Sequence, residues 1–128
     1  NEPDRTASES MLRVRVEGDF DASHTIPGHP GECRHLHGHS YTVEVFVAGG
    51  ELDDNGILKG ADFAELKKVL RDLVGRYDHK HLNDILGDNA TAENIAQTLF
   101  KQLRGRGVNQ LERVRVWESQ KNYAEYWE

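Results

Sequence analysis

Two stretches of strict alternation constrain the fold of this chain more than any other feature. Residues 11–17 read MLRVRVE and residues 41–48 read YTVEVFVA, with apolar side chains at every second position. Successive side chains of a strand point to opposite faces, so this period of two predicts strands with one buried and one polar face. The side chains on the predicted buried faces are Leu12, Val14 and Val16 in the first strand and Tyr41, Val43, Val45 and Val47 in the second.

Two later segments have the spacing of amphipathic helices, with apolar residues three or four positions apart. Asp62 would cap the first helix, and Thr91 would cap the second, which runs to about residue 104 and ends at a GRG sequence. Residues 111–117, LERVRVW, predict a third strand, and we expect a further short strand in the tail. The order β-β-α-α-β-β indicates an α+β fold in which both helices cover one face of the sheet. The inward positions are Phe63, Leu66, Leu70, Leu73 and Val74 in the first helix and Ile95, Leu99, Phe100 and Leu103 in the second.

The opposite face of such a sheet carries many charges. They belong to one glutamate and four arginines, namely Arg13, Arg15, Glu44, Arg113 and Arg115. Charged side chains lose too much hydration energy to be covered by an apolar layer, so this face should stay wet. The pattern alone favours bulk solvent, and a water-filled tunnel inside a ring of subunits is the alternative.

Composition and charge limit the class of protein. The chain has 128 residues and suits one domain, which we place at 11–128 after a polar leader, 1–10, that we predict to be disordered. A net charge of −6 argues against a nucleic-acid partner. No apolar run approaches the roughly 18 residues of a membrane span. A single cysteine, Cys33, excludes an internal disulfide and fits a reducing, cytoplasmic compartment.

Three histidines have the spacing of a metal site. His37 and His39 are two residues apart at the start of the second strand, so their imidazoles would point to the same face. His24, at the end of the first strand pattern, can supply a third nitrogen. Three neutral histidines around zinc leave one coordination position open, as in catalytic zinc sites. The alternative is that these are ordinary surface or capping histidines.

Further reactive side chains follow in the sequence. Cys33 precedes His37 closely, and its thiolate could act as a base or as a fourth metal ligand, unless it is a small buried hydrophobe. The Asp78 carboxylate could fix the tautomer of a histidine. The side chains of adjacent residues, however, rarely form a hydrogen bond with each other where the chain is extended. We therefore expect Asp78 and His79 to face different partners, with turn capping as the alternative. Glu118 could accept two hydrogen bonds from a guanidine-like edge of a heterocycle, such as the N–C(NH2)–N edge of a pterin, or be a surface carboxylate.

The order of several short motifs resembles one known family. In chain order the motifs are FDASH at 20–24, Cys33-x3-His37-Gly38-His39, DFAELK at 62–67, DHKHLND at 78–84, TAEN at 91–94 and VWES at 116–119. Together they resemble the 6-pyruvoyl-tetrahydropterin synthase family, which includes the 6-carboxy-tetrahydropterin synthases of queuosine and other deazapurine pathways. The similarity runs from about Met11 to about Ser119, and its most specific part is C-x3-H-G-H with the upstream histidine.

The resemblance implies the tunnelling fold, with an antiparallel four-stranded sheet and two helices on one face. Three subunits would close their sheets into a barrel, two trimers would stack into a homohexamer, and active sites would lie at subunit interfaces. The charged sheet face would then line the tunnel. The family's zinc ligands fall on His24, His37 and His39, its proton-abstracting cysteine on Cys33, its relay pair on Asp78 and His79, and its substrate-binding residues on Glu118 and Thr91.

The resemblance also implies a reaction, with 7,8-dihydroneopterin triphosphate as substrate and zinc as cofactor. Cys33 would remove a proton from the substrate side chain, and His79 with Asp78 would manage its return. We favour the carboxy branch, which forms 6-carboxy-5,6,7,8-tetrahydropterin and releases acetaldehyde and triphosphate. The alternatives are the pyruvoyl activity, a dual role in folate synthesis suggested by Glu32 beside Cys33, and a non-catalytic protein that binds a pterin or purine.

The sequence departs from the family pattern at a few positions. Residues 56–61, GILKGA, indicate a small insertion before Asp62, and Tyr77 stands where leucine is frequent. Ala90 occupies a position before Thr91 where proline is usual. None of these belongs to the expected zinc set, although the insertion could reshape the rim of the pocket.

Overall fold

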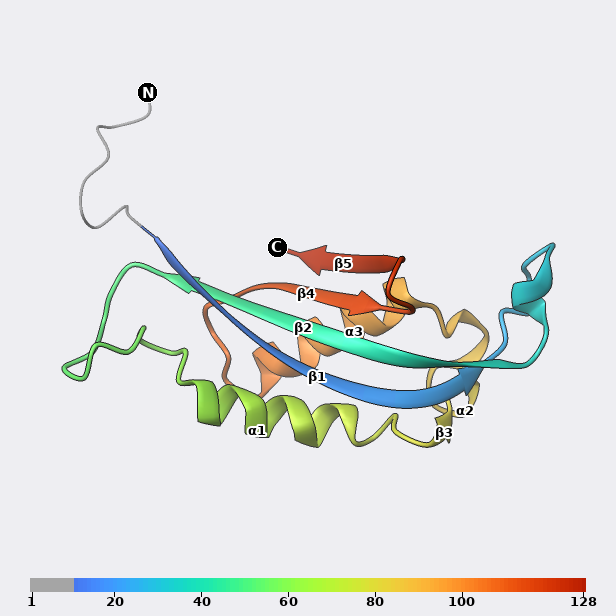
Figure 1. Cartoon of the computed structure of the whole chain (residues 1–128), viewed down its shortest axis with the longest axis horizontal. Helices are drawn as coiled ribbons and strands as arrows, with labels where there is room; N and C mark the ends of the chain where they lie inside the picture. Colours follow the sequence, from blue (N-terminus) through green and yellow to red (C-terminus); the bar gives the residue numbers. More distant parts are fainter. Residues whose placement is uncertain (1–10) are drawn as a thin grey trace, which may run out of the picture.

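One long hairpin organises the fold. The computed structural model describes residues 11–128, in which β1 (Leu12–His24) pairs antiparallel with β2 (His37–Gly49) along its whole length (Figure 1). Both strands extend beyond the alternating stretches at 11–17 and 41–48 as far as the histidines. The reason lies in the sequence, because alternate residues of β1 remain buried beyond 17, at Phe20, Ala22 and His24.

The rest of the sheet confirms the predicted α+β fold and adds one short strand. β4 (Leu111–Trp117) pairs antiparallel with β2, and β5 (Tyr123–Trp127) pairs antiparallel with β4. The additional strand, β3 (Lys80–His81), has two residues and runs parallel to β1 beside Ala22 and Ser23. The sheet order is therefore β3-β1-β2-β4-β5.

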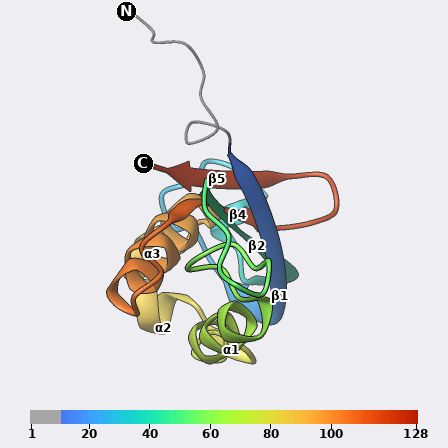
Figure 2. The ribbon, with the colours of Figure 1, turned by 90° about the vertical axis from the view of Figure 1, so that its left-hand side faces the viewer.

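Two amphipathic helices cover one face of this sheet (Figure 2). α1 (Phe63–Val74) begins after Asp62, whose carboxylate accepts the Glu65 backbone N–H at 3.1 Å. α3 (Ala92–Gly105) begins after Thr91, whose hydroxyl accepts the Asn94 backbone N–H at 3.1 Å. Both predicted caps are thus confirmed. The prediction of a buried side chain is wrong at two positions, because Phe63, at the first position of α1, and Leu12, at the start of β1, are both exposed.

Short elements connect the long ones. The 3-10 turn η2 (Glu32–Arg34) lies in the loop between β1 and β2 and contains Cys33. A single-turn helix, α2 (Asn83–Leu86), and the 3-10 turn η3 (Gly87–Asn89) lead into α3. The predicted order β-β-α-α-β-β did not include α2, which adds a short helix between the two long ones. Within 11–128 no helix is long and apolar enough to cross a membrane, and the predicted leader 1–10 lies outside the described residues.

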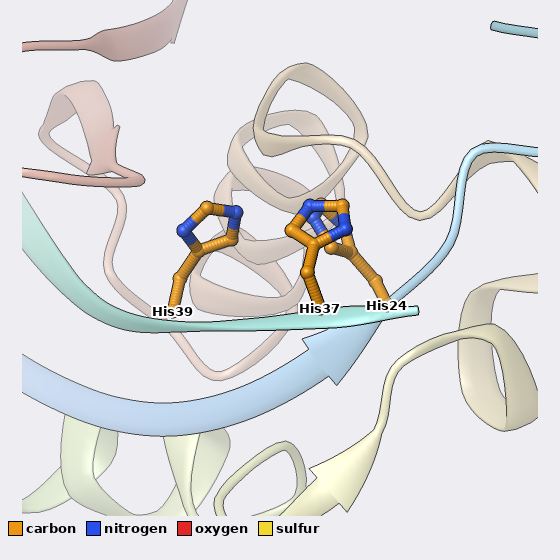
Figure 3. Close-up of side chains that lie close together, drawn as sticks. All are labelled: His24, His37 and His39. Atoms are coloured by element: carbon orange, nitrogen blue, oxygen red, sulfur yellow. The ribbon is translucent and has the colours of Figure 1, made fainter. Parts of the chain in front are cut away.

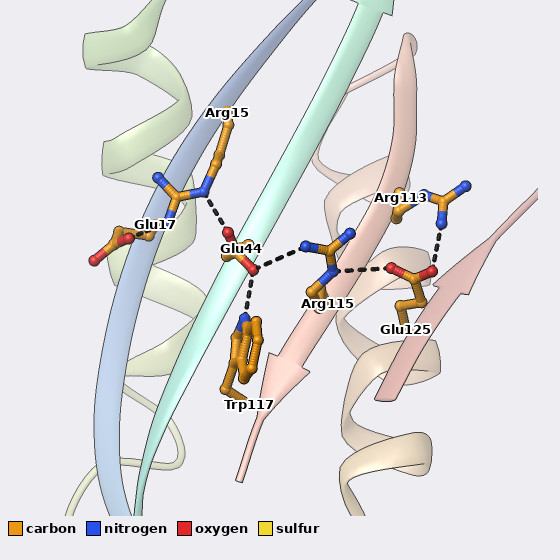
Figure 4. A network of polar contacts seen from close by, with 7 residues as sticks. All are labelled: Arg15, Glu17, Glu44, Arg113, Arg115, Trp117 and Glu125. Carbon is orange, nitrogen blue, oxygen red and sulfur yellow. Dashed lines mark hydrogen bonds and ion pairs between the residues drawn. The ribbon is translucent and has the colours of Figure 1, made fainter. Parts of the chain in front are cut away.

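The face of the sheet that the helices leave uncovered carries a network of ion pairs and hydrogen bonds (Figure 4). Its charged side chains therefore bond to one another and do not only contact water. Glu44, at its centre, is only 7% exposed and accepts hydrogen bonds from Arg15 and from the Trp117 indole, the latter at 2.5 Å. Arg115 approaches Glu44 at 3.5 Å and Glu125 at 2.9 Å. Burial acts to raise the pKa of Glu44, but these hydrogen bonds and charges outweigh it and hold the pKa below its usual value.

Candidate metal centre

The open end of the hairpin brings His24, His37 and His39 together. The strand register sets His24 directly opposite His37, and His39 follows two residues later on the same face of β2. The ring centroids lie 4.4 Å apart for His24 and His37, 4.8 Å for His37 and His39, and 5.1 Å for His24 and His39 (Figure 3). One ring nitrogen from each lies within 4.8 Å of the other two.

Backbone carbonyls set the tautomers of two of these rings. The Nδ1 atom of His24 lies 2.6 Å from the Ala90 carbonyl oxygen, and that of His37 lies 2.7 Å from the His35 carbonyl oxygen. A carbonyl only accepts hydrogen bonds, so each Nδ1 carries the proton and donates it. The lone pair of each ring therefore resides on Nε2. This is the outer contact that metal-binding histidines generally make.

The third ring, that of His39, differs from the other two because one of its nitrogens lacks a hydrogen-bond partner among the described residues. This nitrogen is Nε2, and it is buried. Burial lowers the pKa of His39, although the nearby Glu118 carboxylate opposes this, so the ring favours the neutral form. A buried polar atom without a partner is costly, and a metal ion would supply the missing contact. Three neutral imidazoles facing one point fit a divalent cation such as zinc.

Cys33 shares a cavity with two of the histidines. The cavity has a volume of about 260 Å³ and is lined by Glu32, Cys33, His35, Leu36, His37, His39 and Glu118. The Cys33 carbonyl oxygen accepts the Ile26 backbone N–H at 2.8 Å, which folds the loop over the end of the hairpin. The described chain has two groups of converging ligand atoms, the three histidines and the set Asp21, Asp78 and His79, and neither includes Cys33. The thiol is thus placed beside the centre, and the geometry does not favour it as a fourth ligand.

Glu118 follows β4 and points its carboxylate at the histidines. Its two oxygens lie 3.8 Å from the Nε2 atoms of His24 and of His39, respectively. The carboxylate is about a quarter exposed and lines the same cavity as Cys33. One acidic group therefore faces both the ligand nitrogens and the space in which a substrate would lie.

Asp78 and His79 bond to each other, which corrects the expectation that they face different partners. His79 Nδ1 lies 3.0 Å from an Asp78 carboxylate oxygen, and the other oxygen accepts the Asp21 backbone N–H at 2.9 Å. The pair is possible because the chain is not extended there: His79 has φ of 59°. The Asp21 N–H, and then the His79 ring, hold the pKa of Asp78 below its usual value.

His79 lies in a different cavity from Cys33. This second cavity has a volume of about 550 Å³ and is lined by Asp21, Ala22, Ser23, Gly38, His39, Ser40, His79, Lys80 and His81. The His79 side chain is 79% exposed. Within one chain the Asp78–His79 pair and the Cys33 cavity are therefore separate. Only His39 lines both.

The remaining expected site residue, Thr91, is placed one residue after the carbonyl that holds His24. Its hydroxyl is engaged as the cap of α3, and its role in substrate binding stays a prediction. The sequence did not reveal the carbonyls of Ala90 and His35. A metal-binding histidine requires such a partner, but any backbone carbonyl can supply it, so no residue type marks the position.

The chain is similar to known proteins of one family. The family model described as 6-pyruvoyl tetrahydropterin synthase matches residues 13–128. A 6-carboxy-5,6,7,8-tetrahydropterin synthase of Synechocystis sp. is 42% identical over 121 residues, covering 91% of this chain and 94% of that protein. A dihydroneopterin monophosphate aldolase of Pyrococcus furiosus is 37% identical over 108 residues, covering 83% and 89%.

A solved structure gives the same result for the fold. The 6-pyruvoyl tetrahydropterin synthase of Caenorhabditis elegans superposes with a TM-score of 0.81 at 25% sequence identity, covering 93% of this chain and 96% of that one. The match extends over the hairpin, both long helices and the last strands, since it includes nearly the whole of each chain. The chain therefore belongs to the 6-pyruvoyl tetrahydropterin synthase family.

Proposed function

We propose that this chain is a zinc-dependent lyase of the 6-carboxy-tetrahydropterin synthase type. It would convert 7,8-dihydroneopterin triphosphate and one water molecule to 6-carboxy-5,6,7,8-tetrahydropterin, acetaldehyde and triphosphate, a step of queuosine and related deazapurine biosynthesis. The observation that carries the proposal is the convergence of one ring nitrogen from each of three histidines beside the cavity of Cys33 and Glu118. The Synechocystis relative named above supports the choice of the carboxy branch.

His24, His37 and His39 would hold the zinc ion. When bound there, zinc supplies Lewis-acid polarisation of the substrate's side-chain oxygens. The protein contributes the orientation of the rings, because the carbonyls of Ala90 and His35 keep the Nε2 lone pairs aimed inward. A cavity of about 260 Å³ beside the rings leaves room for the pterin side chain rather than for a fourth protein ligand.

Cys33 and Glu118 would act on the bound substrate. Cys33 lines the cavity next to His37 and His39, where its thiolate can remove a proton from the substrate side chain. Glu118 can accept hydrogen bonds from the amidine edge of the pterin, and its position over the Nε2 atoms would set the ring close to the metal.

The returning proton would come from the Asp78–His79 pair of a neighbouring subunit. Asp78 fixes the Nδ1 proton of His79, which leaves Nε2 of His79 to exchange a proton with the substrate. Since the His79 side chain lies in a separate cavity and is largely exposed, it cannot serve Cys33 of its own chain in this arrangement. A homohexamer with sites between subunits would bring the two cavities together.

One observation favours a second activity within the family. Glu32 lines the same cavity as Cys33, so a carboxylate and a thiol both face the substrate space. The Pyrococcus relative is named an aldolase acting on dihydroneopterin monophosphate. We therefore keep retro-aldol cleavage of a dihydroneopterin to a hydroxymethyl-dihydropterin, with Glu32 as base, as the alternative.

Product analysis separates these activities. Zinc-loaded protein would be incubated anaerobically with 7,8-dihydroneopterin triphosphate, with acetaldehyde trapped and pterins identified by mass spectrometry. We expect 6-carboxy-tetrahydropterin and acetaldehyde in equal amounts, lost in Cys33→Ala and retained in the matched variant Glu32→Gln. A pyruvoyl product would reject the carboxy branch. A hydroxymethyl product that disappears in Glu32→Gln would establish the aldolase, and binding without turnover would reject both.

A further inference from the structure

We propose that Tyr41 is a positioning residue of the metal centre, whose hydroxyl fixes the imidazole of His24 together with the Ala90 carbonyl. The alternating sequence explains Tyr41 only as a core residue of β2, and neither the expected ligand set nor the expected catalytic set includes it. The inference rests on the proposed function, because it takes His24 to be a metal ligand.

The Tyr41 hydroxyl contacts the His24 ring close to both of its nitrogens. The hydroxyl oxygen is 3.3 Å from Nδ1 and 3.5 Å from Nε2. The two rings are nearly perpendicular, at 87°, with centroids 6.0 Å apart. The same phenol ring lies 5.5 Å from the His39 ring. One tyrosine therefore borders two of the three metal-binding rings.

Tyr41 is held rigidly enough to act as a support. It is 0% exposed and stacks on Phe20, with ring centroids 4.8 Å apart and planes 11° apart. It also follows His39 by two residues on the same face of β2. The hydroxyl cannot move without displacing a stacked aromatic pair in the core, so its position relative to the metal-binding rings is fixed.

The hydroxyl adds a second constraint to the His24 ring. The Nδ1 proton is donated to the Ala90 carbonyl at 2.6 Å, whereas the Tyr41 oxygen, at similar distances from Nδ1 and Nε2, contacts the ring without lying along its N–H bond. A single hydrogen bond leaves a ring free to swing about it, whereas a rigid contact from a second element opposes that motion. Nε2 of His24 then stays aimed at the other two rings before the metal arrives, which strengthens metal binding by preorganisation.

Tyr77 provides a matched control for removing this hydroxyl. Like Tyr41 it is a buried tyrosine that contacts Phe20, at a ring distance of 5.5 Å. Its hydroxyl, however, contacts Gln102 at 3.5 Å and not a metal-binding histidine. Tyr41→Phe and Tyr77→Phe each delete one buried hydroxyl next to the same phenylalanine, so they share any general effect on the core.

The test measures metal affinity in the two variants and in the unchanged protein. Metal-free protein would be titrated with Zn²⁺ against a competing chelator, and the visible spectrum of the Co²⁺-loaded form would be recorded. We expect Tyr41→Phe to bind Zn²⁺ roughly tenfold more weakly, the lower end of the effect of such outer contacts, and to shift the Co²⁺ bands. Tyr77→Phe should match the unchanged protein in both, while urea unfolding of the metal-free forms should give similar losses for the two variants.

Three outcomes would overturn the inference. Equal Zn²⁺ affinity and equal Co²⁺ spectra in all three proteins would show that Tyr41 is only a core residue, and would leave the proposed function intact. Tighter binding in Tyr41→Phe would show that the hydroxyl competes with the metal for Nε2 of His24. Failure of the unchanged protein to take up Zn²⁺ would reject the proposed function together with the role of Tyr41.

Discussion

His39 and His24 should respond in opposite directions when each is replaced by leucine in the metal-free protein. His39 has a buried Nε2 without a partner among residues 11–128, a feature that costs about 1–3 kcal/mol when fully desolvated. Because its side chain is 23% exposed, we expect the low end, so His39→Leu should gain about 1 kcal/mol of unfolding free energy. The same substitution removes a metal ligand.

His24→Leu, in contrast, removes a hydrogen bond that the folded protein makes without metal. His24 is 0% exposed and donates to the carbonyl of Ala90, which is also fully buried. Removing the donor leaves that carbonyl unpaired, so we expect a loss of about 2 kcal/mol, within the range for an orphaned buried acceptor. The two variants should therefore differ by about 3 kcal/mol, although both delete one imidazole of the same site.

Urea unfolding in the presence of a chelator measures both values, and repeating it with zinc provides the control. The unchanged protein should gain about 2.7 kcal/mol at a free zinc concentration one hundred times its dissociation constant, and both variants should lose most of this gain. If His39→Leu destabilises the metal-free protein as much as His24→Leu, then His39 is a satisfied structural residue and our account of its Nε2 is wrong.

Other parts of the structure give further expectations. Glu44→Gln should lose about 2 kcal/mol at pH 7, because Glu44 is buried and bonded to Arg15 and Trp117. The Glu44 pKa is depressed, so its contribution is present above the unfolded value of about 4.3 and lost as pH falls through the folded one. Urea titrations at several pH values should show this gap closing in acid, and a gap that widens in acid would contradict it. Cys33→Ala should abolish turnover yet bind Zn²⁺ as tightly as the unchanged protein, as measured by chelator competition. Weaker binding would make the thiol a ligand. Finally, Cys33→Ala and His79→Ala, each inactive alone, should regain part of the activity when unfolded and refolded together, because hybrid interfaces would restore one intact site. No regain would place both groups in one chain's site.

The sequence was sufficient where a single side chain decides the local structure. Alternation in β1 and β2 defined the buried face, and His37 and His39, two residues apart, necessarily share it. Asp62 and Thr91 were recognisable as caps because their side-chain oxygens satisfy backbone N–H groups at helix starts.

The sequence was insufficient to predict local structure where contacts between distant residues determine it. The positive φ of His79, which lets it bond to Asp78, is rare for a residue other than glycine, so no local rule predicts it. β3 forms only because its two residues reach the free edge of β1 near Ala22. Glu44 looked like a solvated residue, and its burial depends on arginines from two other strands.

The coordination of the bound metal decides whether His24, His37 and His39 form an open catalytic site. X-ray absorption at the zinc edge of the fully loaded, substrate-free protein would report the atoms around the ion. The proposed site should show three imidazole nitrogens at about 2.0–2.1 Å and a light-atom fourth ligand. A sulfur at about 2.3 Å, or fewer than three imidazoles, would contradict it, because the thiol would then occupy the position reserved for substrate.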